Sequence, residues 1–162
     1  MGKCDRDTWE IIQNAFNEAE GFFNSREFAQ AIEKFKFFLT VDGLPLSFRM
    51  IAHFSLAQSL VKDFGKDDDR VLDTVSKRTW SEAASNFDMC AHLYDYFFDS
   101  RQKSFPRFKV MRNQAKERLD YIVFRKGGGV KYFNGHWATD NSLCADFRPF
   151  EGYSEMYTVE KR

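Results

Sequence analysis

Apolar residues recur every three or four positions over most of the first 125 residues, which is the spacing of one face of an α-helix. In the first such stretch, the recurring residues are Trp9, Ile12, Phe16, Ala19 and Phe23. Gly, Pro or strongly polar segments separate each stretch from the next. The pattern therefore predicts five helices, at about residues 8–23, 26–40, 46–64, 80–98 and 106–125.

The predicted helix ends fall at residues that start or stop a helix. The sequence VDGLP ends the second helix and Gly65 closes the third, because Gly adopts left-handed conformations and Pro cannot continue the hydrogen-bond ladder. Thr79 and Glu82 have the capping-box spacing at the start of the fourth helix. Pro106 suits the first turn of the fifth helix, where its missing N–H has no partner to lose.

Two segments lack the helical pattern. Residues 66–78 are polar and predict a solvated loop. Near the C-terminus, β-forming residues flank Asn134-Gly135, a dipeptide favoured in two-residue hairpin turns, so a short β-hairpin is predicted at 130–138. The rest of the tail is predicted to be irregular. It is rich in Tyr, Phe and Trp, and we expect it to fold back onto the helices, either along a helical face or as a cap on the fifth helix.

The second and fourth predicted helices share one spacing, an aromatic residue, then Ala three positions later, then Phe four positions after that. The residues are Phe28, Ala31 and Phe35 in one helix and Trp80, Ala83 and Phe87 in the other. The preceding helices carry Ala19 and Ala57, small residues of the kind that allow two helices to cross closely. The spacing indicates two helical hairpins of one kind.

With these residues, the chain resembles a tetratricopeptide repeat (TPR) protein, in which repeats of about 34 residues each form two helices. The two repeats would span about residues 12–45 and 50–97. The resemblance implies a mostly α-helical domain of stacked antiparallel hairpins over residues 1–129, capped by the fifth helix, with residues 130–162 packed on it. Ala31 and Ala83 lie 52 residues apart, and the excess over one repeat falls mainly in the predicted loop. The alternative is a five-helix bundle whose spacing is coincidental.

In TPR proteins, the first helix of each repeat lines the binding face. The resemblance therefore implies a partner-binding face that comprises Phe16, Glu20, Phe23, Asn24, Phe54, Gln58 and Lys62. Phe16 and Glu20 stand where chaperone-binding TPRs carry Lys and Asn to clamp a terminal carboxylate, so we expect apolar anchors to hold a partner instead. The alternative is that Phe16, Phe23 and Phe54 are core residues.

The net charge of zero is the sum of unlike segments. Residues 1–100 carry −6, residues 101–131 carry +8 and residues 132–162 carry −2. The basic segment provides a second candidate surface, which comprises Arg107, Arg112, Lys116, Arg125, Lys126 and Lys131. Positive charge next to aromatic residues is typical of nucleic-acid binding. Alternatively, this charge complements the acidic hairpins, within the chain or in a second copy.

The sequence lacks the patterns of common catalytic and metal sites. His53, His92 and His136 lie on different predicted elements and outside any metal-binding motif. The three Cys are widely separated, which favours a reducing, cytoplasmic location over a disulfide framework. No apolar run is long enough to span a membrane. We therefore expect a non-enzymatic protein without cofactor or metal, acting as an adaptor, an assembly subunit or an inhibitor that binds another protein.

Overall fold

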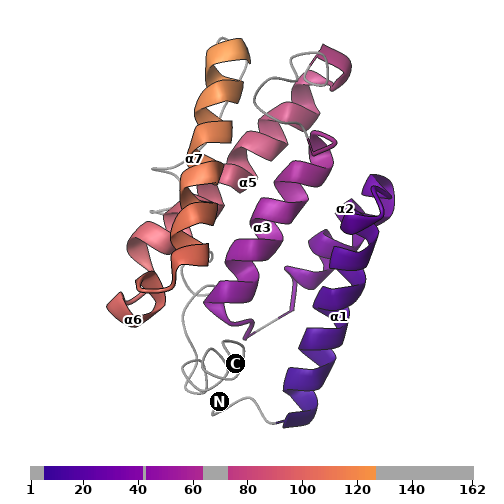
Figure 1. The fold of residues 1–162 in the computed structure, drawn as a ribbon. Helices are drawn as coiled ribbons and strands as arrows, with labels where there is room; N and C mark the ends of the chain where they lie inside the picture. The colour runs from indigo at the N-terminus through magenta and orange to yellow at the C-terminus, as the bar shows by residue number, and fades with distance from the viewer. Residues whose placement is uncertain (1–5, 42, 64–72, 127–162) are drawn as a thin grey trace.

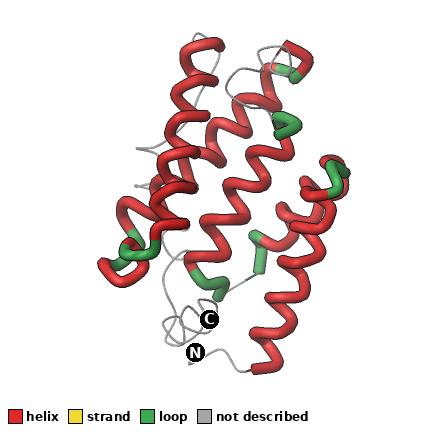
Figure 2. The backbone as a smooth tube through the Cα atoms, in the orientation of Figure 1, coloured by secondary structure: helices red, strands yellow, loops and turns green. Residues whose placement is uncertain are grey.

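The computed structural model describes residues 6–41, 43–63 and 73–126, and helices dominate these residues (Figure 1). The helices are α1 (Arg6–Asn24), α2 (Phe28–Phe38), α3 (Leu46–Leu60), α5 (Lys77–Tyr96), α6 (Ser100–Lys103) and α7 (Pro106–Lys126). The described part of the chain contains no strand (Figure 2). The predicted mostly α-helical fold is confirmed. The β-hairpin predicted at 130–138 and the aromatic tail lie outside the described residues.

The five longer helices form two layers. In Figure 1, α1, α3 and α7 lie in front, and α2 and α5 lie behind them. Each helix packs against the next in the order α1, α2, α3, α5, α7, and α3 also contacts both α1 and α7 within the front layer. As a result α3 is the central helix of the fold, and 13 of its 15 residues are buried.

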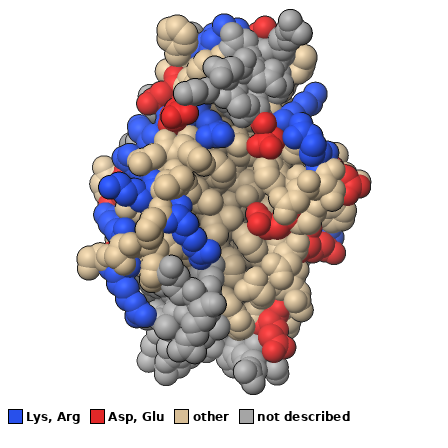
Figure 3. All heavy atoms as spheres, viewed as in Figure 1, with Lys and Arg blue, Asp and Glu red and all other residues tan. Residues whose placement is uncertain are grey.

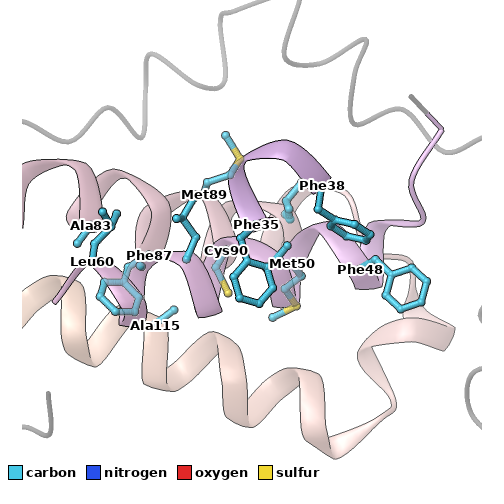
Figure 4. Close-up of a cluster of buried hydrophobic side chains, with 14 of the residues drawn as sticks. Phe35, Phe38, Phe48, Met50, Leu60, Ala83, Phe87, Met89, Cys90 and Ala115 are labelled. Carbon is cyan, nitrogen blue, oxygen red and sulfur yellow. The ribbon is translucent and has the colours of Figure 1, made fainter. Parts of the chain in front are cut away.

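Aromatic rings form much of the core between α1, α2 and α3. The ring of Phe16 packs against Phe35, Phe38 and Phe48 with centroid distances between 5.0 and 6.4 Å. Figure 4 shows this cluster continuing toward Phe87 and its neighbours on α5. Burial of a Phe side chain contributes up to about 3 kcal/mol to the free energy of folding, so these rings provide much of the stability of the packing between the layers.

The alanines of the two predicted hairpins are packing residues. Ala19, Ala31, Ala57 and Ala83 are completely buried. Without a larger side chain at these positions, neighbouring helix backbones approach closely and the large rings on either side interlock. The burial of these alanines is confirmed, and their place at helix crossings stays a prediction.

The start of α5 differs from the prediction. The helix begins at Lys77, three residues before the predicted start, because Ser76 is the N-cap residue. The Ser76 hydroxyl accepts a hydrogen bond from the backbone N–H of Thr79 at 3.2 Å. Thr79 is therefore a first-turn residue, and the predicted capping box of Thr79 and Glu82 is wrong.

The end of α3 also differs from the prediction. The helix ends at Leu60, before Gly65, because Lys62 and Asp63 adopt positive φ angles of 56° and 54°. Their backbone N–H groups bond to carbonyls of the last helical turn, which closes the helix in a Schellman motif. Arg26, with φ of 59°, closes α1 by the same pair of bonds. Helices α1 and α3 are thus each followed by a basic residue, Arg26 or Lys62, at the left-handed position where Gly is usual.

A short helix, α6, lies between α5 and α7 and was not predicted. Its start is a capping box, in which the Asp99 carboxylate accepts from the Gln102 backbone N–H and the Gln102 side chain accepts from the Asp99 backbone N–H, each at 2.8 Å. The helix turns the chain before Pro106, which begins α7 as predicted. The Asp-x-x-Gln spacing was the sequence signal for this turn.

Candidate functional site

The front layer has a surface with opposite charges on its two sides. In Figure 3, an uncharged, hollowed strip runs between Lys and Arg side chains over α7 and Asp and Glu side chains over α1. The central helix α3 lies beneath the strip (Figure 1). Two of the three helices under this surface, α1 and α3, are the first helices of the two predicted hairpins.

On the α1 side, Glu20 contacts α3. Its carboxylate accepts a hydrogen bond from the Ser55 hydroxyl at 3.3 Å. Glu20 is half-buried, and this burial raises the pKa of its carboxyl, while the bond from Ser55 lowers the pKa in part. Within the described residues no Lys, Arg or His forms an ion pair with Glu20.

On the α7 side, Arg118 lies over the floor of the surface. Its guanidinium carbon is 5.6 Å from the ring centroid of Phe54, a cation–π contact between α7 and α3. The Phe54 ring is half-buried and meets Phe87 edge-on at 5.7 Å. The Nε atom of Arg118 is buried and has no hydrogen-bond acceptor among the described residues. We call the surface formed by Glu20, Phe54 and Arg118, with the buried Ser55 beneath Glu20, the front face.

Gln58 lies one turn beyond Phe54 on α3 and is only 3% exposed. Its Nε2 donates to the Asp63 carboxylate at 2.9 Å, and the other Asp63 oxygen lies 3.8 Å from Arg26. The Oε1 atom of Gln58 is buried and lacks a donor within the described residues. Gln58 therefore supports the end of α3, whereas Lys62 and Asn24, at the ends of their helices, are exposed.

The remaining predicted partner-binding residues lie deeper. Phe16 is 7% exposed and packs within the aromatic core, so it does not form part of the surface. Phe23 is half-buried, with its ring 6.0 Å from Phe28. Phe16 is therefore a core residue, as the alternative interpretation of the sequence held. Two residues of the predicted set lie on the front face. Glu20 contacts α3 through Ser55, and Phe54 contacts α7 through Arg118.

The predicted basic surface is partly used for packing. Arg112 forms a bidentate ion pair with Asp95 of α5, with Nε–Oδ1 and Nη2–Oδ2 distances of 3.0 Å each. These hydrogen bonds raise the pKa of Arg112 further. Arg125 lies 3.7 Å from Asp73, and the Arg107 guanidinium stacks 4.6 Å above the Phe108 ring. Two of the predicted nucleic-acid contacts therefore hold α7 in place.

Lys116, another residue of the basic surface, is half-exposed and lies near a buried acid. Asp88 on α5 is 1% exposed, and neither carboxylate oxygen has a hydrogen-bond donor in the described part of the chain. Burial raises the pKa of Asp88 to about 6, although the charge of Lys116 lowers it in part. The Lys126 side chain and Lys131 lie outside the described residues.

Three of the residues considered for chemistry, His53, His92 and Cys90, are buried. His53 Nδ1 is 2.8 Å from the Asn86 side-chain oxygen, and burial lowers the pKa of His53 to about 4. The Cys90 thiol is buried, which raises its pKa. Over residues 6–41, 43–63 and 73–126, no three His, Cys, Asp or Glu side chains are placed to hold a metal ion. Nor does this part of the chain include a helix that is both long and apolar enough to cross a membrane.

Sequence reasoning missed Ser55 and Arg118 as members of the face. Arg118 is one of several basic residues within the fifth predicted helix, and no local pattern distinguishes it from its neighbours. No protein-family model matches the chain, and neither does any curated protein or solved structure. Functional inference for this protein therefore depends on the geometry of the front face.

Proposed function

We propose that the protein is a TPR-like helical adaptor that docks onto another protein through the front face. Two hairpins, α1–α2 and α3–α5, stack in succession, and their first helices align with α7 in one layer. Stacked hairpins of this kind offer an extended surface formed by the first helices. The hollowed, uncharged strip between two charged sides is the observation that supports this role most directly (Figure 3).

The residues of the face favour a partner that inserts one apolar side chain at Phe54 and places polar or charged groups next to Glu20 and Arg118. Phe54 offers a half-buried ring at the floor, which suits insertion of an apolar side chain. Glu20 and Arg118 flank it without counter-ions in the described structure. Since hydrogen bonds to charged groups contribute about 1.5–3 kcal/mol, a partner that pairs with either group gains affinity and a fixed orientation.

Affinity capture with site-directed variants tests this function. The 162-residue chain is used to capture proteins from its native source, and a captured protein is then purified and titrated against variants. Arg118→Ala and Phe54→Ala are expected to weaken its binding at least tenfold. The matched control Phe37→Ala removes a ring that is 70% exposed on α2, in the rear layer, and is expected to leave binding unchanged.

Melting curves check that each variant remains folded, since Phe54 also packs on Phe87. Arg118→Ala removes no core side chain, so its effect on binding is read without that complication. Unchanged affinity in both front-face variants would contradict the proposal.

Nucleic-acid binding by α7 is the alternative. Its phosphate contacts would have to come from residues other than Arg112 and Arg125, which are paired with carboxylates. Fluorescence titration against random oligonucleotides with a salt series distinguishes the two functions, because phosphate contacts strengthen as salt falls. Absence of binding at about 50 mM salt eliminates the nucleic-acid alternative.

A further inference from the structure

The two sides of the front face carry opposite net charge. Helix α1 contains four acidic residues and one basic residue, and α7 contains seven basic and two acidic residues. The two helices lie on either side of α3 within one layer (Figure 1). The face is therefore bipolar across its width, with a negative and a positive edge (Figure 3).

Several charges near these edges are already paired inside the molecule. Lys34 of α2 pairs with Glu18 at 3.1 Å, and Arg112 pairs with Asp95. Glu20 and Arg118 differ, because neither forms an ion pair among the described residues. They contact successive residues of α3, Ser55 and Phe54, from opposite sides. Glu20 therefore provides a negative charge on the α1 side of α3, and Arg118 provides a positive charge on the α7 side. The two side chains do not form an ion pair with each other.

We propose that a second copy of the chain binds the front face in a two-fold dimer, in which α7 of each copy lies against α1 of the other. The inference rests on the docking role proposed above for this face. A two-fold axis along the helix direction reverses the order of the helices across the face, so that each positive edge meets a negative edge. Arg118 of one copy then faces Glu20 of the second, and the same contact occurs twice, as an isologous interface requires.

The outer side of the whole front layer, α1, α3 and α7, is large enough for such a dimer. Helix α1 has 19 residues, which corresponds to a length of about 28 Å. Three adjacent helices spaced 8–10 Å apart give a width of about 25 Å. The product, about 700 Å², is close to the roughly 800 Å² that each partner contributes to a stable interface of standard size. Dimerisation covers the strip, so a second copy competes with the partner of the proposed function.

Charge reversal in the 162-residue chain tests the dimer. Sedimentation equilibrium is measured over the micromolar range for wild type, Glu20→Lys, Arg118→Glu and the double variant. Wild type is expected to dimerise, more weakly as salt rises. Each single reversal places like charges together twice and is expected to raise the dissociation constant at least tenfold. The double variant, and an equimolar mixture of the two single variants, are expected to dimerise again.

Recovery in the mixture also excludes misfolding as the reason for monomeric single variants. The control Glu33→Lys reverses an exposed charge on α2 and is expected to leave the dissociation constant unchanged. A wild-type chain that stays monomeric throughout, or a dimer that neither single reversal weakens, overturns the inference. If the chain is monomeric but Arg118→Ala still weakens partner binding, the proposed function stands without the dimer. If charge reversal weakens the dimer but Arg118→Ala and Phe54→Ala bind the captured partner as tightly as wild type does, the dimer is supported and the proposed docking function is contradicted.

Discussion

The protein is expected to lose stability as the pH rises through about 6, the pKa of Asp88 in the folded state. The substitution Asp88→Asn is expected to remove this loss. Asp88 is buried on α5, and its two carboxylate oxygens lack hydrogen-bond donors in the described structure. Burial raises the pKa of this carboxyl from 3.8 to about 6. The folded state therefore binds the proton more tightly than the unfolded state, and ionisation above the folded pKa favours unfolding.

The magnitude follows from the difference between the two pKa values. A pKa shift of one unit corresponds to about 1.4 kcal/mol, so a carboxyl ionised in both states costs the fold about 3 kcal/mol above pH 7. At about pH 4.5 the folded state remains protonated and the cost falls to about 1 kcal/mol. Stability is thus present at low pH and is lost as the pH rises. Between about pH 4.5 and 7.5 the Asp88 contribution changes by about 2 kcal/mol.

Urea unfolding at these two pH values measures this contribution. Asn at position 88 also buries a polar group, but that cost is the same at both pH values and cancels in the comparison. The titration of His53 cancels too, because it occurs in both proteins. The free energy of unfolding of Asp88→Asn minus that of wild type is expected to be about 2 kcal/mol higher at pH 7.5 than at pH 4.5, so the variant gains stability relative to wild type as the pH rises.

The matched control is Asp120→Asn, which neutralises an exposed carboxylate on the adjacent helix α7. Its free energy of unfolding relative to wild type is expected to change by less than about 0.5 kcal/mol between the two pH values. If Asp88→Asn also shows equal differences at both pH values, the inferred burial of an unpartnered carboxyl is wrong.

Three further predictions concern other positions. Arg112→Lys replaces the bidentate contact with Asp95 by a single one and is expected to cost about 1 kcal/mol in urea unfolding, and a double-mutant cycle with Asp95→Asn should recover the coupling. Lys62→Gly relieves a left-handed backbone at the end of α3 and is expected to raise the free energy of unfolding by about 1 kcal/mol; a loss of stability would contradict the strain. The Cys90 thiol is expected to resist iodoacetamide in the native protein and to react in denaturant, as followed by peptide mass spectrometry; rapid native labelling would disprove its burial.

The existence of the long helices could be predicted because their signal is local. The recurrence from Trp9 to Phe23 depends only on residues within one helix, and α1 forms over that stretch. Helix ends were less predictable, since Ser76 and Thr79 are both good N-cap residues and lie one turn apart. The structure uses Ser76, with Thr79 as the donor to it.

Membership of the candidate site required the tertiary structure. Phe16 and Glu20 lie four residues apart on α1, and the resemblance placed both on the binding face. Packing separates them, because α2 and α3 surround the Phe16 ring while Ser55 meets Glu20 at the edge of the interface. Helical periodicity states which residues share a side of a helix, but it contains no information on how far the neighbouring helix extends across that side.

The sequence by itself determined the helical character of the described chain, the alanines that become buried and the opposite charges of α1 and α7. The tertiary structure decided which of those charges are free to meet a partner. Arg112 and Arg118 are the same residue type on one helix, yet Arg112 is paired with Asp95 and Arg118 lies over Phe54. The physical reason is that an ion pair depends on a side chain 17 positions away in sequence, which only the packing of α5 against α7 brings within hydrogen-bond distance.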